Sequence, residues 1–339
     1  MLQRLRMKKG PGILNLPSNS TRSNPIGYFP IRLDALQNDM ATGFSLYLQP
    51  QPGRAPVLYR DPSLPFTEEV RRRLQANQVE ELLVQRSDRQ AWLSYTEKML
   101  PEYLSDTSHT VNERATLLYE SAQGLVQEIL QKPDMGEMVQ QSRNMVGSMV
   151  GFLFKESTSL HELMQLTSYD YYTYTHSVNV FVYSVSLANR LGLKGPEVNE
   201  FGHGALMHDI GKRKIDTDIT NSRGKLTEEQ WEQMRLHPVH GYEILRAQGE
   251  TSAIALDVTR HHHEKLNGRG YPDGLGNDEI SRWARISTIA DIFDALTTKR
   301  SYKDAMDTFF ALQFMKEKMW DELDHGYFMA FVSMMAKPK

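Results

Sequence analysis

The chain has 339 residues, of which 40% are hydrophobic and 24% are charged, a composition typical of a soluble globular protein too long for one ordinary domain. Its formal net charge of −3 excludes the strongly basic balance that accompanies binding to a nucleic acid polymer. The chain has no cysteine, which excludes disulfides, thiolate nucleophiles and cysteine-built zinc sites, so any metal must be held by nitrogen and oxygen ligands.

Residues 1–30 are rich in Pro, Gly, Asn and Ser without a sustained period, and we predict that they form a flexible arm. No apolar segment follows the basic residues of this arm, which argues against a secretory signal. The longest nearly apolar run, Met145–Phe154, is interrupted by Gly and Ser and is shorter than the ~18–20 residues that cross a membrane. These features predict a cytoplasmic protein without a membrane segment.

Residues 31–106 are predicted to form a small α+β module. Short apolar runs at Phe44–Leu48 and Val57–Tyr59 predict strands, and Thr67 followed by two glutamates predicts the start of a helix. The run Val79–Val84 fits either a strand or the continuation of that helix. No group of catalytic residues lies in this module, so we expect a regulatory or interaction role.

Residues 107–167 are predicted to be linking helices, because apolar residues recur at helical spacing and stop before Pro133, and then recur again over Met138–Leu153. A methionine-rich stripe on the second helix is typical of a packed core or a helix–helix seam. Transmission of a signal and formation of a homodimer both stay open as roles for this pair.

The remaining segment, 168–339, is predicted to be all-α, because alternation of β-branched residues is nearly absent. The predicted helices are Thr175–Leu191, Pro196–His208, Thr227–Gln248, Ser252–His262, Arg282–Lys299 and Thr308–Met335, the last with a break left open. The predicted fold is therefore multidomain, with a helical bundle in the C-terminal half, a small α+β module before it and linking helices between them.

Histidine is concentrated in this helical segment, since eight of the 11 histidines lie between positions 176 and 263. Polar residues interrupt apolar helical faces at seven places: His176, His208, Asp209, His237, His262, His263 and Asp291. A single histidine of this kind is more often a core residue, and Asp291 alone could equally form an ion pair or a cap. The combination favours a metal site, because a buried carboxylate is costly unless it is paired or metal-bound.

A pair of metal ions bridged by a carboxylate is a recognised device for phosphoester hydrolysis, in which a bridging hydroxide attacks phosphorus. Adjacent His208 and Asp209 could direct an imidazole to one metal while the carboxylate reaches between two. Lys212 follows one turn later, where its ammonium could contact a phosphoryl oxygen or protonate the leaving group.

These residues resemble the HD-GYP domain family of the HD hydrolase superfamily. His176, the His208-Asp209 pair and Asp291 match its H…HD…D pattern, and the segment 262–272, which ends in Gly270-Tyr271-Pro272, is similar to its signature. The resemblance covers about half of the chain, residues 168–335. It implies an HD-type helical bundle and a cyclic di-GMP phosphodiesterase that yields linear pGpG, with further hydrolysis to GMP left open.

The resemblance also implies roles for individual residues. The metal ligands would be His176, His208, Asp209, His237, His262, His263 and Asp291, with Asp209 as the bridge. Asp209 and Lys212 would be catalytic, and the substrate would be bound by Lys212, Gly270, Tyr271, Arg300 and Lys303. The metals would be divalent, most often iron or manganese in this family. The Gly270-Tyr271-Pro272 loop is also expected to bind diguanylate cyclase (GGDEF) domains.

Three positions depart from the family pattern. Tyr172 stands where some members have a third-metal glutamate, so two metals are expected here. Asn267 replaces the usual loop aspartate and should keep its local hydrogen bond, and Asp216 replaces a proline at the substrate mouth. These departures keep open a second function, a non-catalytic cyclic di-GMP receptor. A third reading is a hydrolase of mononucleotides or of another cyclic dinucleotide.

Three further histidines in the segment are not expected to be ligands. His203 is expected to pack or hydrogen-bond within the bundle, His240 to lie at the surface or behind a ligand, and His261 to face differently from at least one member of the ligand pair His262-His263. Glu264 would either orient a ligand imidazole or cap a helix end.

Overall fold

The computed structural model divides the chain into two compact units, Met1–Tyr95 and Thr96–Lys339. The described residues are 26–51, 54–132, 135–155, 158–166, 173–220, 222, 224–299 and 304–336. Most of the predicted arm, together with Tyr172, Arg300 and Lys303, therefore lies outside the described residues. No helix in the described part of the chain is long and apolar enough to cross a membrane.

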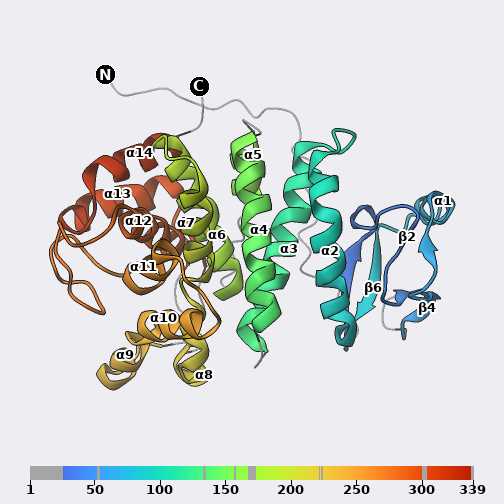
Figure 1. The fold of residues 1–339 in the computed structure, drawn as a ribbon, viewed down its shortest axis with the longest axis horizontal. Coiled ribbons are helices and arrows are strands. Elements are labelled where there is room, and N and C mark those ends of the chain that lie inside the picture. Colours follow the sequence, from blue (N-terminus) through green and yellow to red (C-terminus); the bar gives the residue numbers. More distant parts are fainter. Residues whose placement is uncertain are drawn as a thin grey trace. The chain divides into compact units, whose positions relative to one another are not determined.

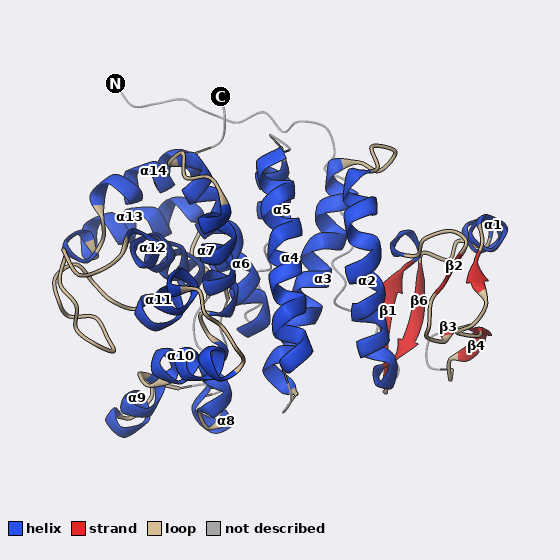
Figure 2. Ribbon diagram, viewed as in Figure 1, coloured by secondary structure: helices blue, strands red, loops and turns tan. Residues whose placement is uncertain are grey.

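The first unit is built on a four-stranded antiparallel sheet with the strand order β1-β6-β3-β4, beside which β2 pairs with β5 (Figure 2). The elements that begin in this unit are β1 (Tyr28–Arg32), η1 (Leu33–Ala35), β2 (Met40–Ala41), β3 (Leu46–Leu48), β4 (Val57–Arg60), β5 (Pro65–Phe66), α1 (Glu68–Ala76), β6 (Glu81–Gln85), η2 (Arg86–Asp88) and α2 (Arg89–Ser105). The predicted α+β character of this region is confirmed.

Local sequence explains these elements. Thr67 caps α1 by accepting a hydrogen bond from the backbone N–H of Val70, as the predicted helix start requires. The ambiguous run near position 80 forms a strand, because its pairing of Leu82 with Ile31 of β1 buries Leu82 completely in the sheet core. β1 begins at Tyr28, within the range predicted for the arm.

The second unit is all-helical in its described residues (Figures 1 and 2). Its elements after α2 are α3 (Val111–Gln131), α4 (Gly136–Lys155), α5 (Ser159–Leu166), α6 (Thr173–Arg190), α7 (Pro196–Met207), η3 (Ile210–Lys214), α8 (Thr217–Thr220), α9 (Glu228–Met234), α10 (His237–Ala247), α11 (Ala253–His261), α12 (Arg282–Thr297), α13 (Thr308–Lys318), η4 (Trp320–Glu322) and α14 (His325–Met335). The predicted fold class is confirmed, whereas the four-part division into arm, module, linking helices and catalytic domain stays a prediction.

Helix α6 is the centre of this unit. It packs against α3, α7, α12 and α14, and every residue from Thr175 to Ala188 is buried. A helix that is apolar around most of its circumference is stable only when other helices cover it on all sides. The ligand candidate His176 therefore lies at the buried start of a fully enclosed helix.

The predicted single helix Thr227–Gln248 is wrong, because the structure breaks it into α9 and α10. Pro238 lacks a backbone N–H, and its ring would clash with the carbonyl of Met234 if the helix continued, so the chain turns between them. The break places His237 at the first turn of α10. The break left open in the last predicted helix is present as well, between α13 and α14, where Asp324 caps the new helix.

Candidate metal centre

All seven predicted metal ligands lie together in the second unit. They come from α6, α10 and α12 and from the turns that directly follow α7 and α11. Their ligand atoms form three overlapping groups, in each of which the atoms lie within 4.8 Å of one another: His237, His262 and His263; His176, His208 and Asp291; and His208, Asp209 and His262. The helical spacing of the sequence does not itself bring these residues together, so their convergence is a property of the fold.

The imidazoles of His176 and His208 face each other with their Nε2 atoms 3.2 Å apart. The Nδ1 atom of His208 lies 2.8 Å from the carbonyl oxygen of Ala205, which can only accept, so this nitrogen carries a proton. The Nδ1 atom of His176 likewise donates to a carboxylate oxygen of Asp294 at 2.7 Å. In the tautomers with the proton on Nδ1, both Nε2 atoms present lone pairs to each other.

A second histidine pair repeats this arrangement. The Nε2 atoms of His237 and His262 lie 3.2 Å apart, and their Nδ1 atoms donate to the carbonyl oxygens of Met234 and Thr259. Burial lowers the pKa of both imidazoles well below the usual range, so these rings stay neutral. Facing lone pairs repel unless a cation lies between them, so the donor set fits a divalent metal ion at each pair.

Asp209 lies between the two pairs and turns a different oxygen to each. Its Oδ2 atom is 3.5 Å from Nε2 of His176 and 3.4 Å from Nε2 of His208, and its Oδ1 atom is 3.3 Å from Nε2 of His237. The whole side chain is buried. This is the arrangement that a carboxylate bridging two metal ions requires.

Asp291 belongs to the first group. Its Oδ1 atom lies 3.0 Å from Nε2 of His176, and its Oδ2 atom lies 3.4 Å from Nδ1 of His263, the residue at the more open side of the centre. Burial alone would raise the pKa of Asp291, but the facing His176 and His263 hold it well below its usual range, so the carboxylate is ionised.

The chain around His208 is shaped by the end of α7. The helix ends at Met207, and Asp209 has φ −93° and ψ 4°, so the backbone leaves the helical conformation here. As a result, the adjacent side chains of His208 and Asp209 both reach the metal centre. Gly211 follows where η3 touches α10, and a Cβ there would lie 1.8 Å from the carbonyl oxygen of His237. Only glycine allows this approach, which brings Asp209 within reach of His237.

Lys212 lies on η3 with Nζ 2.6 Å from Oδ2 of Asp209. Burial would raise the pKa of Asp209, but Lys212 and His208 outweigh it and hold the pKa well below its usual range. With side-chain exposures of 17% and 24%, Lys212 and His263 mark the side of the centre that solvent reaches. A substrate would approach from this side.

The loop after α11 covers part of this side. The Tyr271 ring lies against His263, tilted by 31° with ring centroids 4.6 Å apart, and burial raises the pKa of Tyr271, which keeps the phenol protonated. A Cβ on Gly270 would lie 2.4 Å from Cα of Glu264, so this glycine permits the loop to fold back on itself. Arg300 and Lys303, the other predicted substrate contacts, lie outside the described residues.

Glu264 holds this loop. Its buried carboxylate accepts hydrogen bonds from the backbone N–H groups of Asp273, Gly274 and Leu275. The sequence suggested that Glu264 orients an imidazole or caps a helix end. In the structure its carboxylate instead binds the backbone of the loop. The expectation for Asn267 is confirmed, since its Oδ1 atom accepts from the N–H of Arg269 within the same loop.

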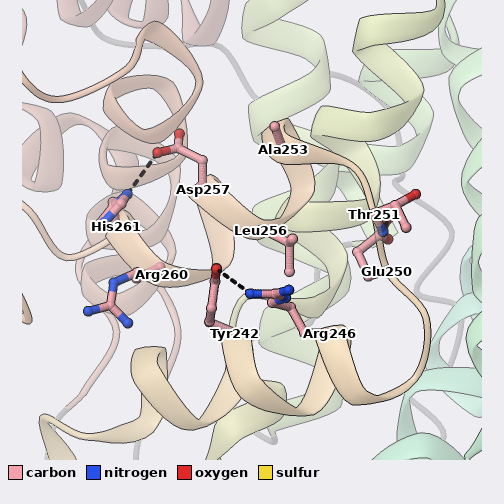
Figure 3. Close-up of a pocket in the computed structure, with 9 residues that line it drawn as sticks. All are labelled: Tyr242, Arg246, Glu250, Thr251, Ala253, Leu256, Asp257, Arg260 and His261. Carbon is pink, nitrogen blue, oxygen red and sulfur yellow. Dashed lines mark hydrogen bonds and ion pairs between the residues drawn. The ribbon is translucent and has the colours of Figure 1, made fainter.

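His203 and His261 bind partners outside the metal centre, as expected. His203 contacts Ser142 of α4 and Glu250, at 2.9 and 2.7 Å. His261 lines a separate cavity of about 630 Å³ between α10 and α11, where it contacts Asp257 at 2.7 Å (Figure 3). His240, 3.6 Å from Glu243, contacts no ligand candidate among the described residues.

Asp294, whose carboxylate accepts the Nδ1–H of His176, is a site residue that was not predicted from the sequence. It follows Asp291 by three residues and so lies on nearly the same face of α12. That spacing was the available signal, because a metal-binding imidazole usually donates its second N–H to an acceptor of this kind.

Comparison with known proteins agrees with this geometry. A family model described as an HD domain matches residues 98–325. HD domains bind divalent metal ions, and the His/Asp groups of this chain could hold them.

Two curated relatives are phosphodiesterases by name. The chain is 35% identical over 221 residues to the cyclic di-GMP phosphodiesterase PA4108 of Pseudomonas aeruginosa, covering 64% of this chain and 53% of the relative. It is 38% identical over 159 residues to the 3'3'-cGAMP-specific phosphodiesterase 3 of Vibrio cholerae, covering 47% and 34%. The chain thus spans about half of the first relative and a third of the second.

Among solved structures, the fold resembles Bd1817, described as a HDG"Y"P protein from Bdellovibrio bacteriovorus. The TM-score is 0.64, the sequence identity is 20%, and the match covers 91% of this chain and 99% of the other. At this identity the likeness concerns the fold.

Proposed function

The chain belongs to the HD domain family and carries the motifs of its HD-GYP branch, and on this premise we propose that it is a metal-dependent phosphodiesterase that hydrolyses cyclic di-GMP to linear pGpG. The observation that carries the proposal is the position of Asp209 between two histidine pairs whose lone pairs converge. Hydrolysis of a phosphodiester uses this arrangement, whereas a purely structural histidine cluster has no need of it.

One metal ion would be held by His176, His208 and Asp291, and the other by His237, His262 and His263, with one oxygen of Asp209 for each. The bound ions would supply an activated water and positive charge beside the phosphodiester. An all-nitrogen and oxygen donor set of this kind suits iron and manganese, and we propose two such divalent ions.

The remaining chemistry falls to residues at the open side of the centre. Water adds to phosphorus, the bond from phosphorus to the 3′-oxygen breaks, and that oxygen takes up a proton. Lys212 would contact the scissile phosphate, where its ammonium stabilises the developing charge or gives the leaving oxygen its proton. Gly270, Tyr271, Arg300 and Lys303 would bind the nucleotide.

A second substrate is supported by a specific observation. Two relatives whose sequences are 38% and 40% identical to this chain over the aligned residues are named 3'3'-cGAMP-specific phosphodiesterases. These relatives favour testing 3'3'-cGAMP beside cyclic di-GMP. The receptor alternative has no such support, because the relatives reported above are named phosphodiesterases.

The test is a hydrolysis assay on anaerobically purified protein, combined with elemental analysis. We expect two metal ions per chain and release of pGpG from cyclic di-GMP, with 3'3'-cGAMP and mononucleotides as parallel substrates. Protein that contains both ions and binds cyclic di-GMP without releasing product would overturn the proposal in favour of the receptor.

We also propose a cytoplasmic location and binding of diguanylate cyclase (GGDEF) domains through Gly270-Tyr271-Pro272. A homodimer through the linking helices belongs to the same set of proposals. A pull-down with an isolated GGDEF domain tests the proposed binding of diguanylate cyclase domains. Analytical ultracentrifugation of the full chain tests the proposed homodimer.

A further inference from the structure

Three of the four paired imidazoles are oriented by their own part of the chain. His208 and His262 directly follow α7 and α11, and His237 follows the end of α9 by three residues. The last carbonyls of a helix have no partner within it, so each Nδ1–H can bind the carbonyl three residues earlier. The Nδ1 hydrogen bond of each of these three rings is thus supplied by local backbone.

His176 cannot use this device. It is the fourth residue of α6, so the backbone carbonyls around it are committed to the helix. Its Nδ1–H instead donates to Oδ2 of Asp294 on α12. The orientation of this one ligand therefore depends on side chains from other helices.

Asp294 is itself fixed by a further hydrogen bond. The side-chain amide of Asn179 donates through Nδ2 to Oδ1 of Asp294 at 2.8 Å, and its Oδ1 accepts the hydroxyl proton of Tyr119 on α3. The reverse amide orientation would bring two oxygens together at Asp294. The carboxylate therefore determines the donor-to-acceptor direction of both hydrogen bonds, from Tyr119 to Asn179 and from Asn179 to Asp294. Tyr119, Asn179 and Asp294 are all buried, with exposures of 4%, 0% and 1%.

From this geometry we infer that Tyr119 and Asn179 are positioning residues for the metal site that contains His176, acting through Asp294. The inference rests on the proposed metal-binding role of His176 and adds to it a link from α3, one of the predicted linking helices. Loss of an outer-shell partner of this kind typically lowers metal affinity by about 10- to 100-fold. The site built on His237 and His262 has no such link among the described residues.

The experiment is titration of metal-stripped full-length protein with Mn²⁺, followed by isothermal calorimetry and by the EPR signal of the free ion. Tyr119→Phe removes only the hydroxyl group. We expect one of the two binding steps to weaken by about 10-fold and the other to keep its wild-type affinity. Asn179→Ala should weaken the same step.

The matched control is Tyr95→Phe. Tyr95 is equally buried, at 4% exposure, and its hydroxyl accepts a hydrogen bond from the backbone of Gln37 in the first unit. We expect both binding steps to stay unchanged in this variant. In a Tyr119→Phe/Asp294→Asn double variant, the loss should not exceed that of Asp294→Asn alone, because both act on the same path.

The outcomes separate the inference from the proposed function. If wild-type protein binds neither Mn²⁺ nor, under anaerobic conditions, Fe²⁺, the proposed function fails. If wild-type protein binds two ions and Tyr119→Phe binds them equally well, or weakens both steps alike, the positioning role is wrong and the proposed function stands.

Discussion

Nζ of Lys212 lies 2.6 Å from Oδ2 of Asp209, the same oxygen that faces His176 and His208. The ammonium therefore neutralises part of the charge on the bridging carboxylate in the absence of substrate. It lies one helical turn from the carboxylate in sequence, and its flexible stem can reach toward the open side of the centre.

Lys212→Ala tests whether Lys212 acts on the scissile phosphate or only neutralises Asp209. We expect metal content to stay close to wild type and kcat for cyclic di-GMP hydrolysis to fall by about 10²- to 10⁴-fold, because a positioned proton donor or phosphate contact is lost. Lys214→Ala is the control, since Lys214 is exposed and pairs with Glu243 away from the centre. Full activity of Lys212→Ala would remove Lys212 from the catalytic machinery.

Asp209→Ala removes an oxygen from each proposed metal site at once. We expect elemental analysis to find both ions depleted and turnover to fall by more than about 100-fold, the upper end for loss of an outer-shell partner. Asp218→Ala, a substitution at an exposed aspartate of α8, should alter neither quantity. Retention of two tightly bound ions in Asp209→Ala would show that the carboxylate does not bridge them.

Gly211→Ala tests the close approach of η3 to α10. The added Cβ would meet the carbonyl oxygen of His237, so η3 must move, at a cost of about 1–3 kcal/mol or more. We expect a lower thermal midpoint together with loss of metal, because Asp209 and Lys212 move with η3. Gly151→Ala on α4 has nothing within 4 Å of the new Cβ and should be neutral or slightly stabilising.

Glu250→Gln should change stability in a pH-dependent way. Burial would raise the pKa of Glu250, but the hydrogen bonds from His203 and the backbone of Ser252 outweigh it and lower the pKa to about 2. A carboxylate whose pKa is lower in the folded state stabilises the protein above its unfolded pKa near 4.5, and this contribution is lost as pH falls toward 2.

The size of this contribution is on the order of 3 kcal/mol. Urea unfolding of wild type and Glu250→Gln should therefore give midpoints that differ most above pH 5 and converge as the pH approaches 2. Glu243→Gln is the control, because solvent screens the exposed pair that Glu243 makes with Lys214. A midpoint difference that stays constant from pH 3 to pH 7 would contradict the prediction.

The seven ligand candidates were implied by the resemblance of short motifs to a known family, and their convergence in the fold supports that expectation. The His208-Asp209 pair and the His262-His263 pair each follow a helix whose apolar period is plain. The interaction of Tyr119 with Asn179 could not be predicted, because it depends on how α3 packs against α6, and helical periodicity does not determine the rotation of one helix against another.

The one wrong helix and the one element left open between strand and helix have different causes. Pro238 was a sequence signal for the helix break before His237. The prediction of one helix over Thr227–Gln248 did not use this signal. The strand β6 could not be distinguished from a helix by periodicity, because Leu82, Leu83 and Val84 are buried on both faces and no alternation remains.

The hydrogen bonds from three successive backbone amides to Glu264 affect how the loop after α11 can move. A single carboxylate shields the N–H groups of Asp273, Gly274 and Leu275 from solvent, so one local opening must release them together. Their deuterium uptake would follow a common rate, and that rate would measure how often the segment carrying Tyr271 lifts away from the buried imidazoles.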